Sequence, residues 1–160
     1  MGLLLVETRA GVLYVTDRGA GQWDPGERDT VIRNTASADG PGVTIRCAQD
    51  PGAAGVSDVS AMATLLAGYT VRFERETGDK VVRAGPVASQ ARAGNVKVLR
   101  APWNAEFFRR LNAFPTPQVP DDDVDALSQG YTELHPAAGR APPVAAVRPA
   151  VAPIMSPFTV

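Results

Sequence analysis

Short apolar runs alternate with stretches of helical periodicity over the first 135 residues, and this alternation limits the folds open to the chain. LLLVE (residues 3–7) and VLYVTD (residues 12–17) flank a glycine-containing turn, which predicts two antiparallel strands. Further strands are predicted at VTIRCA, YTVRF and NVKVL, with helical patterns between and after them. A hairpin followed by alternating helices and strands predicts an α/β fold in which helices flank a mixed sheet.

Capping residues predict where the helices begin. Asp24 followed by Pro25 predicts an N-cap and a first helical residue, for a helix that runs to about Ala38. Ser57 is predicted to cap the next helix, which continues to Gly68. The remaining helices are expected over residues 79–92, 104–114 and 122–134, and the last is predicted to place Val124, Leu127, Tyr131 and Leu134 on one face.

From residue 136 onwards the composition changes to PAAGRAPPVAAVRPAVAPIMSPFTV, which supports neither a helix nor a core. We therefore expect one domain over residues 1–135 and an irregular, disordered Pro/Ala-rich tail over residues 136–160. No apolar run approaches the roughly 18 residues of a membrane span, and MGLLLVE lacks the basic region of a signal peptide. These features predict a cytoplasmic protein with no membrane partner.

The sequence has one cysteine, Cys47, and one histidine, His135. An internal disulfide and a cysteine-built zinc site are therefore excluded, and sites that need several histidines lack their ligands. Chemistry in this chain must then rely on carboxylates, and carboxylate oxygens suit Mg²⁺ or Mn²⁺.

Four carboxylates crowd into five positions of the stretch FPTPQVPDDDVDALSQGY, namely Asp121, Asp122, Asp123 and Asp125. One interpretation is a solvated helix start, because the unpaired N–H groups and the positive dipole end of a helix offset repulsion between the carboxylates. In that case Asp121 or Asp122 is the N-cap. The other interpretation is that Asp121, with Asp122 or Asp125, binds a divalent metal. Both interpretations remain open from the residues alone.

Asp50 follows the strand VTIRCAQ directly and precedes the turn PGAAG. Carboxylates at the ends of neighbouring sheet elements are typical of oxygen-ligand metal pairs that hydrolyse phosphodiesters, although Asp-Pro-Gly is also a common turn sequence. The middle of the chain, from Tyr69 to Arg110, is basic, whereas the formal net charge of the whole chain is -1. Basic residues there suit phosphate contacts or solvated helix faces, and the near-neutral total argues against tight, independent DNA binding. The sequence contains no GxxxxGK pattern, so no ATPase site is predicted.

Three segments in the right order strongly resemble the C-terminal nuclease domain of the large terminase subunit of tailed bacteriophages and prophages. They are NTASADGPGVTIRCAQDPGAAG, LLAGYTVRFERETGDKVVRAGPVASQARAGNVKVLRAPWNAEFFRRLNAFP and DDDVDALSQGY. The resemblance implies a ribonuclease-H-like fold and metal-dependent endonucleolytic cleavage of concatemeric double-stranded DNA during packaging, in the cytoplasm of the bacterial host. It also implies a pair of Mg²⁺ or Mn²⁺ ions, and double-stranded DNA, the terminase small subunit and the portal protein as partners.

Residue by residue, the resemblance implies catalytic and metal-binding roles for Asp50, Asp121 and Asp122. The closing motif of the family reads His-Asp-Asp before a variable residue and VDAL. Here Pro120 replaces the histidine and Asp123 fills the variable position. The basic residues Lys80 and Arg83 fall in another family motif, where they are candidates for contacts to the DNA backbone or for a structural role near the site.

The main departure from the family is at the start of the sequence. The family's first catalytic aspartate lies on a strand before the one predicted at LLLVE, and this sequence begins after that strand and after the N-terminal ATPase domain. We therefore expect a sheet without its first strand, an incomplete two-metal site, and a chain that is a fragment or a degenerate prophage remnant. Two alternatives are a non-catalytic interaction module of the packaging motor and another enzyme of the same fold, such as a resolvase or an integrase.

Overall fold

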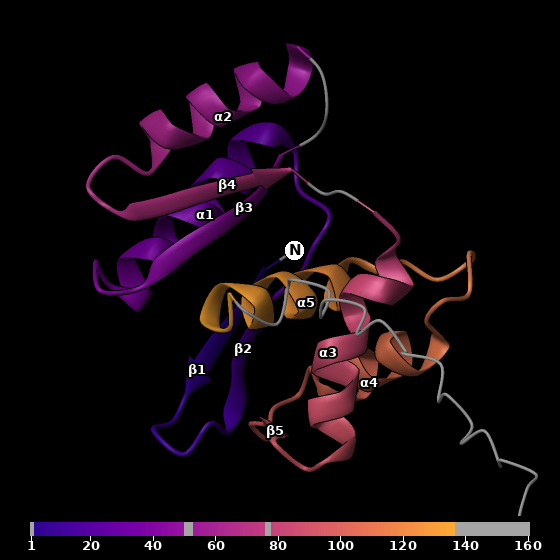
Figure 1. Cartoon of the computed structure of the whole chain (residues 1–160). Helices are drawn as coiled ribbons and strands as arrows, with labels where there is room; N and C mark the ends of the chain where they lie inside the picture. The colour runs from indigo at the N-terminus through magenta and orange to yellow at the C-terminus, as the bar shows by residue number, and fades with distance from the viewer. Residues whose placement is uncertain (1, 50–52, 76–77, 137–160) are drawn as a thin grey trace, which may run out of the picture.

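The computed structural model describes residues 2–49, 53–75 and 78–136 (Figure 1). The predicted site residue Asp50 and the predicted disordered tail from residue 137 onwards lie outside the described residues. In the described part of the chain, no helix is both long and apolar enough to cross a membrane.

The described elements alternate as the sequence predicts, and they confirm the α/β fold class. In chain order they are β1 (Gly2–Glu7), β2 (Leu13–Gly19), α1 (Pro25–Asp39), β3 (Thr44–Gln49), α2 (Ala53–Leu65), β4 (Thr70–Arg75), α3 (Lys80–Arg92), β5 (Val96–Val98), α4 (Asn104–Ala113) and α5 (Asp122–Leu134).

The described strands form two sheets, where a single mixed sheet is predicted. The first sheet has the order β1-β2-β5 and is mixed, because β1 pairs antiparallel with β2 while β5 pairs parallel with it. In the second sheet, β3 and β4 pair parallel from Thr44↔Thr70 to Gln49↔Arg75. β1 and β3 both lie at sheet edges, and no described strand is hydrogen-bonded between them. Helix α5 packs against both strands and so connects the two sheets (Figure 1).

Side-chain caps account for the starts of two of the described helices, α1 and α3. The carboxylate of Asp24 accepts a hydrogen bond from the backbone of Glu27, whose side chain accepts one from the backbone of Asp24, so α1 begins with a capping box. The prediction that Ser57 caps the second helix is wrong, because α2 already begins at Ala53. Alanine is the strongest helix former, so the two alanines before Gly55 favour an earlier start.

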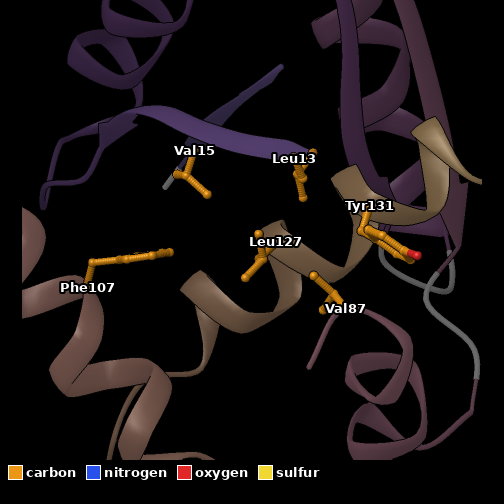
Figure 2. Packing of buried hydrophobic residues seen from close by; sticks show 6 residues of the cluster. All are labelled: Leu13, Val15, Val87, Phe107, Leu127 and Tyr131. Atoms are coloured by element: carbon orange, nitrogen blue, oxygen red, sulfur yellow. The ribbon is translucent and has the colours of Figure 1, made fainter. Parts of the chain in front are cut away.

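The main hydrophobic core lies between β2 and three helices. Its buried residues are Leu13, Val15, Val87, Phe107, Leu127 and Tyr131, from β2, α3, α4 and α5 (Figure 2). In the predicted buried face of α5, Val124, Leu127 and Tyr131 are buried, whereas Leu134 at the helix end is 38% exposed. This core fixes α3 and α4 beside the acidic start of α5, where the candidate site lies.

Candidate functional site

The backbone of Asp121 starts helix α5, but its carboxylate does not cap the helix. The Asp121 carbonyl accepts hydrogen bonds from the N–H groups of Val124 and Asp125, as at an N-cap. Within the described part of the chain, its carboxylate makes no capping hydrogen bond. The interpretation of the cluster as a capped helix start is therefore correct for the backbone of Asp121 and wrong for its side chain.

The carboxylates of Asp121 and Asp125 converge on Lys80, the first residue of α3. The Lys80 Nζ donates to Asp121 Oδ2 at 2.8 Å and to Asp125 Oδ2 at 2.9 Å. The hydrogen bond to Asp121, followed by the one to Asp125, raises the pKa of Lys80, so its ammonium stays charged at neutral pH. Arg83, one turn later on α3, donates to Asp125 Oδ1 at 3.1 Å. The structure therefore brings both predicted basic residues to the acidic cluster.

Asp123 is the buried member of the cluster, with an exposed fraction of 0%. Arg18 of β2 donates from Nε to Asp123 Oδ1 at 2.7 Å and from Nη2 to Oδ2 at 2.9 Å, which is a bidentate arginine–carboxylate pair. The hydrogen bond from Arg18 to Asp123 also raises the pKa of that guanidinium. Sequence reasoning missed this pair, because it placed Asp123 at a variable position and gave Arg18 no role.

Asp122 pairs with a different helix from the carboxylates that meet at Lys80. Its side chain is 62% exposed, and its Oδ2 lies 3.8 Å from Nη1 of Arg110 on α4. Arg110 also donates to Glu106 on its own helix at 2.7 Å. Hydrogen bonds from Arg109 and then Arg110 lower the pKa of Glu106 to about 2, so this carboxylate is ionised near neutral pH. Asp122 therefore lies beside an arginine that already has an anionic partner.

Comparison with protein families gives a match to a family described as Terminase RNaseH-like domain, over residues 10–134. The match extends from β2 to the end of α5 and includes the acidic cluster with its basic partners. The chain belongs to the terminase RNaseH-like domain family. Comparisons with curated proteins and with solved structures give no significant match. Membership of this family agrees with the predicted ribonuclease-H-like fold and indicates a nuclease-type role.

Nuclease domains of the ribonuclease-H-like type generally use divalent metals, and carboxylates are the side chains of this terminase domain that could bind them. Asp121 and Asp125 each direct one oxygen to a single cation, the Lys80 ammonium. Carboxylate oxygens are the ligands that Mg²⁺ prefers. In the described ranges no group of three or more Asp, Glu, His or Cys side chains is placed to hold a metal. Among the described carboxylates, Asp121 and Asp125 are therefore the candidates for a metal site, because two of their oxygens converge on one cation.

A second set of ion pairs fixes the other end of α5 in this terminase domain. Glu133 accepts from Arg46 of β3 at 3.1 Å and pairs with Arg72 of β4 at 2.6 Å, and Arg46 also pairs with Glu74. These contacts hold α5 against the second sheet. The predicted ligand Asp50 directly follows β3 in the sequence, so the Glu133 contacts position α5 relative to the strand that leads to Asp50.

Proposed function

We propose that this chain is the nuclease part of a terminase large subunit, which cuts concatemeric double-stranded DNA with Mg²⁺ or Mn²⁺ during genome packaging. The observation that carries the proposal is the convergence of Asp121 and Asp125 on one cation position, within the segment that matches the terminase RNaseH-like family. In this proposal the partners are double-stranded DNA, the terminase small subunit and the portal protein, and the protein acts in the cytoplasm of the bacterial host.

Each residue then has a stated part in phosphodiester hydrolysis. Asp121 and Asp125 would hold the metal, and Asp50 and Asp122 are further proposed ligands. A bound divalent ion would lower the pKa of the water molecule that it binds, and it would stabilise negative charge on the phosphoryl group. Lys80 and Arg83 lie on the same side of the cluster and position the DNA backbone through its phosphates.

The test is nicking of supercoiled plasmid by the purified chain in Mn²⁺, with an EDTA control. Asp121→Asn removes a metal ligand while keeping the side-chain shape, so we expect cleavage to fall by at least about 100-fold, as for the loss of a group that stabilises the transition state. Asp29→Asn is the matched control, because Asp29 lies on α1 with a 42% exposed side chain and pairs with neighbouring Arg28. Equal nicking by the parent and Asp121→Asn would reject this site.

A non-catalytic packaging module is the second candidate function, and one observation favours it. Each carboxylate of the acidic cluster lies within ion-pair distance of a basic side chain of the chain itself, and the described residues offer no group of three potential ligands. A folded chain that shows no saturable Mn²⁺ binding and no nicking would support this candidate and reject the nuclease function.

A further inference from the structure

Lys80 occupies the point at which the two converging carboxylates meet. Its Nζ lies 2.8 Å from Asp121 Oδ2 and 2.9 Å from Asp125 Oδ2. Lys80 is the first residue of α3, which Asp79 caps and which packs along α5, so the backbone holds this lysine beside the acidic cluster. The chain therefore supplies its own cation to the position at which its candidate metal ligands converge.

Lys80 is also placed so that it can leave this position. Its side chain is 43% exposed and ends in a compact, strongly hydrated ammonium on a flexible stem. Arg18 is the contrast, because it is 7% exposed and its removal would leave the buried charge of Asp123 with only a more distant cation, Arg110, whose Nε lies 3.6 Å from Asp123 Oδ2. Withdrawal of Lys80 into solvent frees two carboxylates that already lie partly at the surface, and Asp125 keeps its ion pair with Arg83.

We propose that Lys80 is a built-in counter-ion of Asp121 and Asp125, and that a divalent cation displaces it on binding these carboxylates. The inference rests on the proposed nuclease function and adds a regulatory element to it. An ammonium and a metal ion cannot occupy the same position between two oxygens, so each excludes the other. Metal then binds only to chains in which Lys80 has withdrawn. The apparent affinity is therefore the intrinsic affinity multiplied by the fraction of such chains.

Mn²⁺ binding by the full chain without DNA, followed by the electron paramagnetic resonance signal of free Mn²⁺, tests this competition. Lys80→Met removes the competing ammonium, and we expect Mn²⁺ to bind at least about fivefold more tightly than to the parent. Lys97→Met is the matched control, because Lys97 is the only other lysine and lies exposed on β5. Lys80→Arg keeps a cation at the position, so it should restore an affinity close to that of the parent.

A direct measurement of the lysine side chains separates displacement from a general effect of charge. Because the sequence has only Lys80 and Lys97, a chain labelled with ¹³C at lysine Cε gives two side-chain signals in nuclear magnetic resonance spectra. Titration with Mg²⁺ should shift the Lys80 signal and leave the Lys97 signal in place. In Asp121→Asn the Mg²⁺-dependent shift of Lys80 should be lost.

The outcomes distinguish this inference from the proposed function. An unchanged Mn²⁺ affinity in Lys80→Met, or a Lys80 signal that does not move at saturating Mg²⁺, overturns the inference even if the chain cuts DNA. Tighter Mn²⁺ binding by Lys80→Met in a chain that cuts no DNA supports the counter-ion role and rejects the nuclease function. Absence of Mn²⁺ binding in both the parent and Lys80→Met overturns both.

Discussion

At the residue scale, the acidic cluster of α5 consists of carboxylates with different surroundings. Asp123 is fully buried against Arg18, and Asp121 shares Lys80 with Asp125. Opposite charges a few ångströms apart attract each other, so these cations offset the repulsion between neighbouring aspartates. A chain of nearly neutral total charge can therefore concentrate four carboxylates in one place.

We expect Arg18→Met to lower the free energy of unfolding by about 3 kcal/mol, because it removes the bidentate partner of the buried Asp123 carboxylate and leaves only Arg110, whose Nε lies 3.6 Å from Asp123 Oδ2. Urea denaturation followed by circular dichroism measures this change. Adding Asp123→Leu to Arg18→Met should recover most of the loss, since replacement of both members of a buried pair by apolar residues is often neutral.

Arg28→Met is the control for the loss of an arginine from an ion pair. The pair of Arg28 and Asp29 on α1 is solvent-exposed, at 54% and 42%. Its removal should change the free energy of unfolding by less than about 1 kcal/mol. Equal losses of unfolding free energy in Arg18→Met and Arg28→Met would mean that burial does not increase the contribution of the Arg18–Asp123 pair to stability.

Cys47 of β3 gives a prediction about pH, because burial raises the pKa of its thiol. The thiolate is the reactive form, so the folded chain should react more slowly with a thiol reagent at pH 8 than the urea-unfolded chain does. Since the folded pKa lies above the unfolded one, the stability contributed by the protonated thiol is present below the unfolded pKa and is lost as pH rises through the folded pKa. Equal rates in the folded and unfolded chains would contradict this. Cys47 is the only cysteine, so the signal has one source.

The sequence predicts which residues gather at the site better than it predicts how they pair. Acidity at the start of α5 and a role for Lys80 near it follow from the motifs, whereas the partner of each carboxylate depends on how α3 and β2 pack against α5. The sequence does contain a signal that Asp123 is buried. It precedes Leu127 and Tyr131 by four and eight residues, so it lies on their buried face of the helix.

At the element scale, helix boundaries are predictable where the stop or start signal is local. Helix α1 begins at Pro25 and α5 covers Asp122–Leu134, as predicted. Ser57 does not mark the start of α2, because a serine can cap a helix only where the helix begins. The alanines before it favour a helix that has already started at Ala53. The division into two sheets depends on which strand edges meet, and that information is spread over the whole fold.

The N-cap aspartates of α3 and α5 differ, because the carboxylate of Asp79 caps its helix and the carboxylate of Asp121 does not. Their loss should therefore have different effects on stability. Asp79 accepts hydrogen bonds from the N–H groups of Val81 and Val82, whereas Asp121 is paired with Lys80. We expect Asp79→Ala to lower the free energy of unfolding by about 1 kcal/mol through loss of the cap. Asp121→Ala should cost less, since an ion pair this exposed contributes about 0–1 kcal/mol.

Thermal and urea unfolding of both alanine variants, without added metal, measures the difference. Asp29→Ala serves as the control for loss of an aspartate from a helix surface. A larger loss of unfolding free energy for Asp121→Ala than for Asp79→Ala would mean that the Asp121 carboxylate stabilises α5 itself. It would contradict a role for this carboxylate that is limited to binding a cation.

At the scale of the whole molecule, the buried core is unevenly distributed. The main cluster and the partly buried residues packed on it come from β1, β2, β5, the helices α3, α4 and α5, and the residue before α4. In the part made of α1, β3, α2 and β4, Ala36 and Leu66 are the only buried hydrophobic residues among those that the structure describes. Its attachment to the rest relies largely on α5 and on the ion pairs of Glu133.

We therefore expect native-state hydrogen exchange to separate the two parts. Amides of β3 and β4 should open at a free energy about 2 kcal/mol below that of β2 and α5, because few buried apolar contacts hold that sheet and regions of low contact density open first. Phe107→Ala, in the main core, should lower protection throughout the chain, since loss of the core unfolds both parts. Leu66→Ala removes an equally buried side chain outside this core, so its effect should be confined to α1, β3, α2 and β4. Uniform loss of protection in both variants would mean that the chain opens as one cooperative unit, in which case α5 couples the sheets more strongly than its contacts suggest.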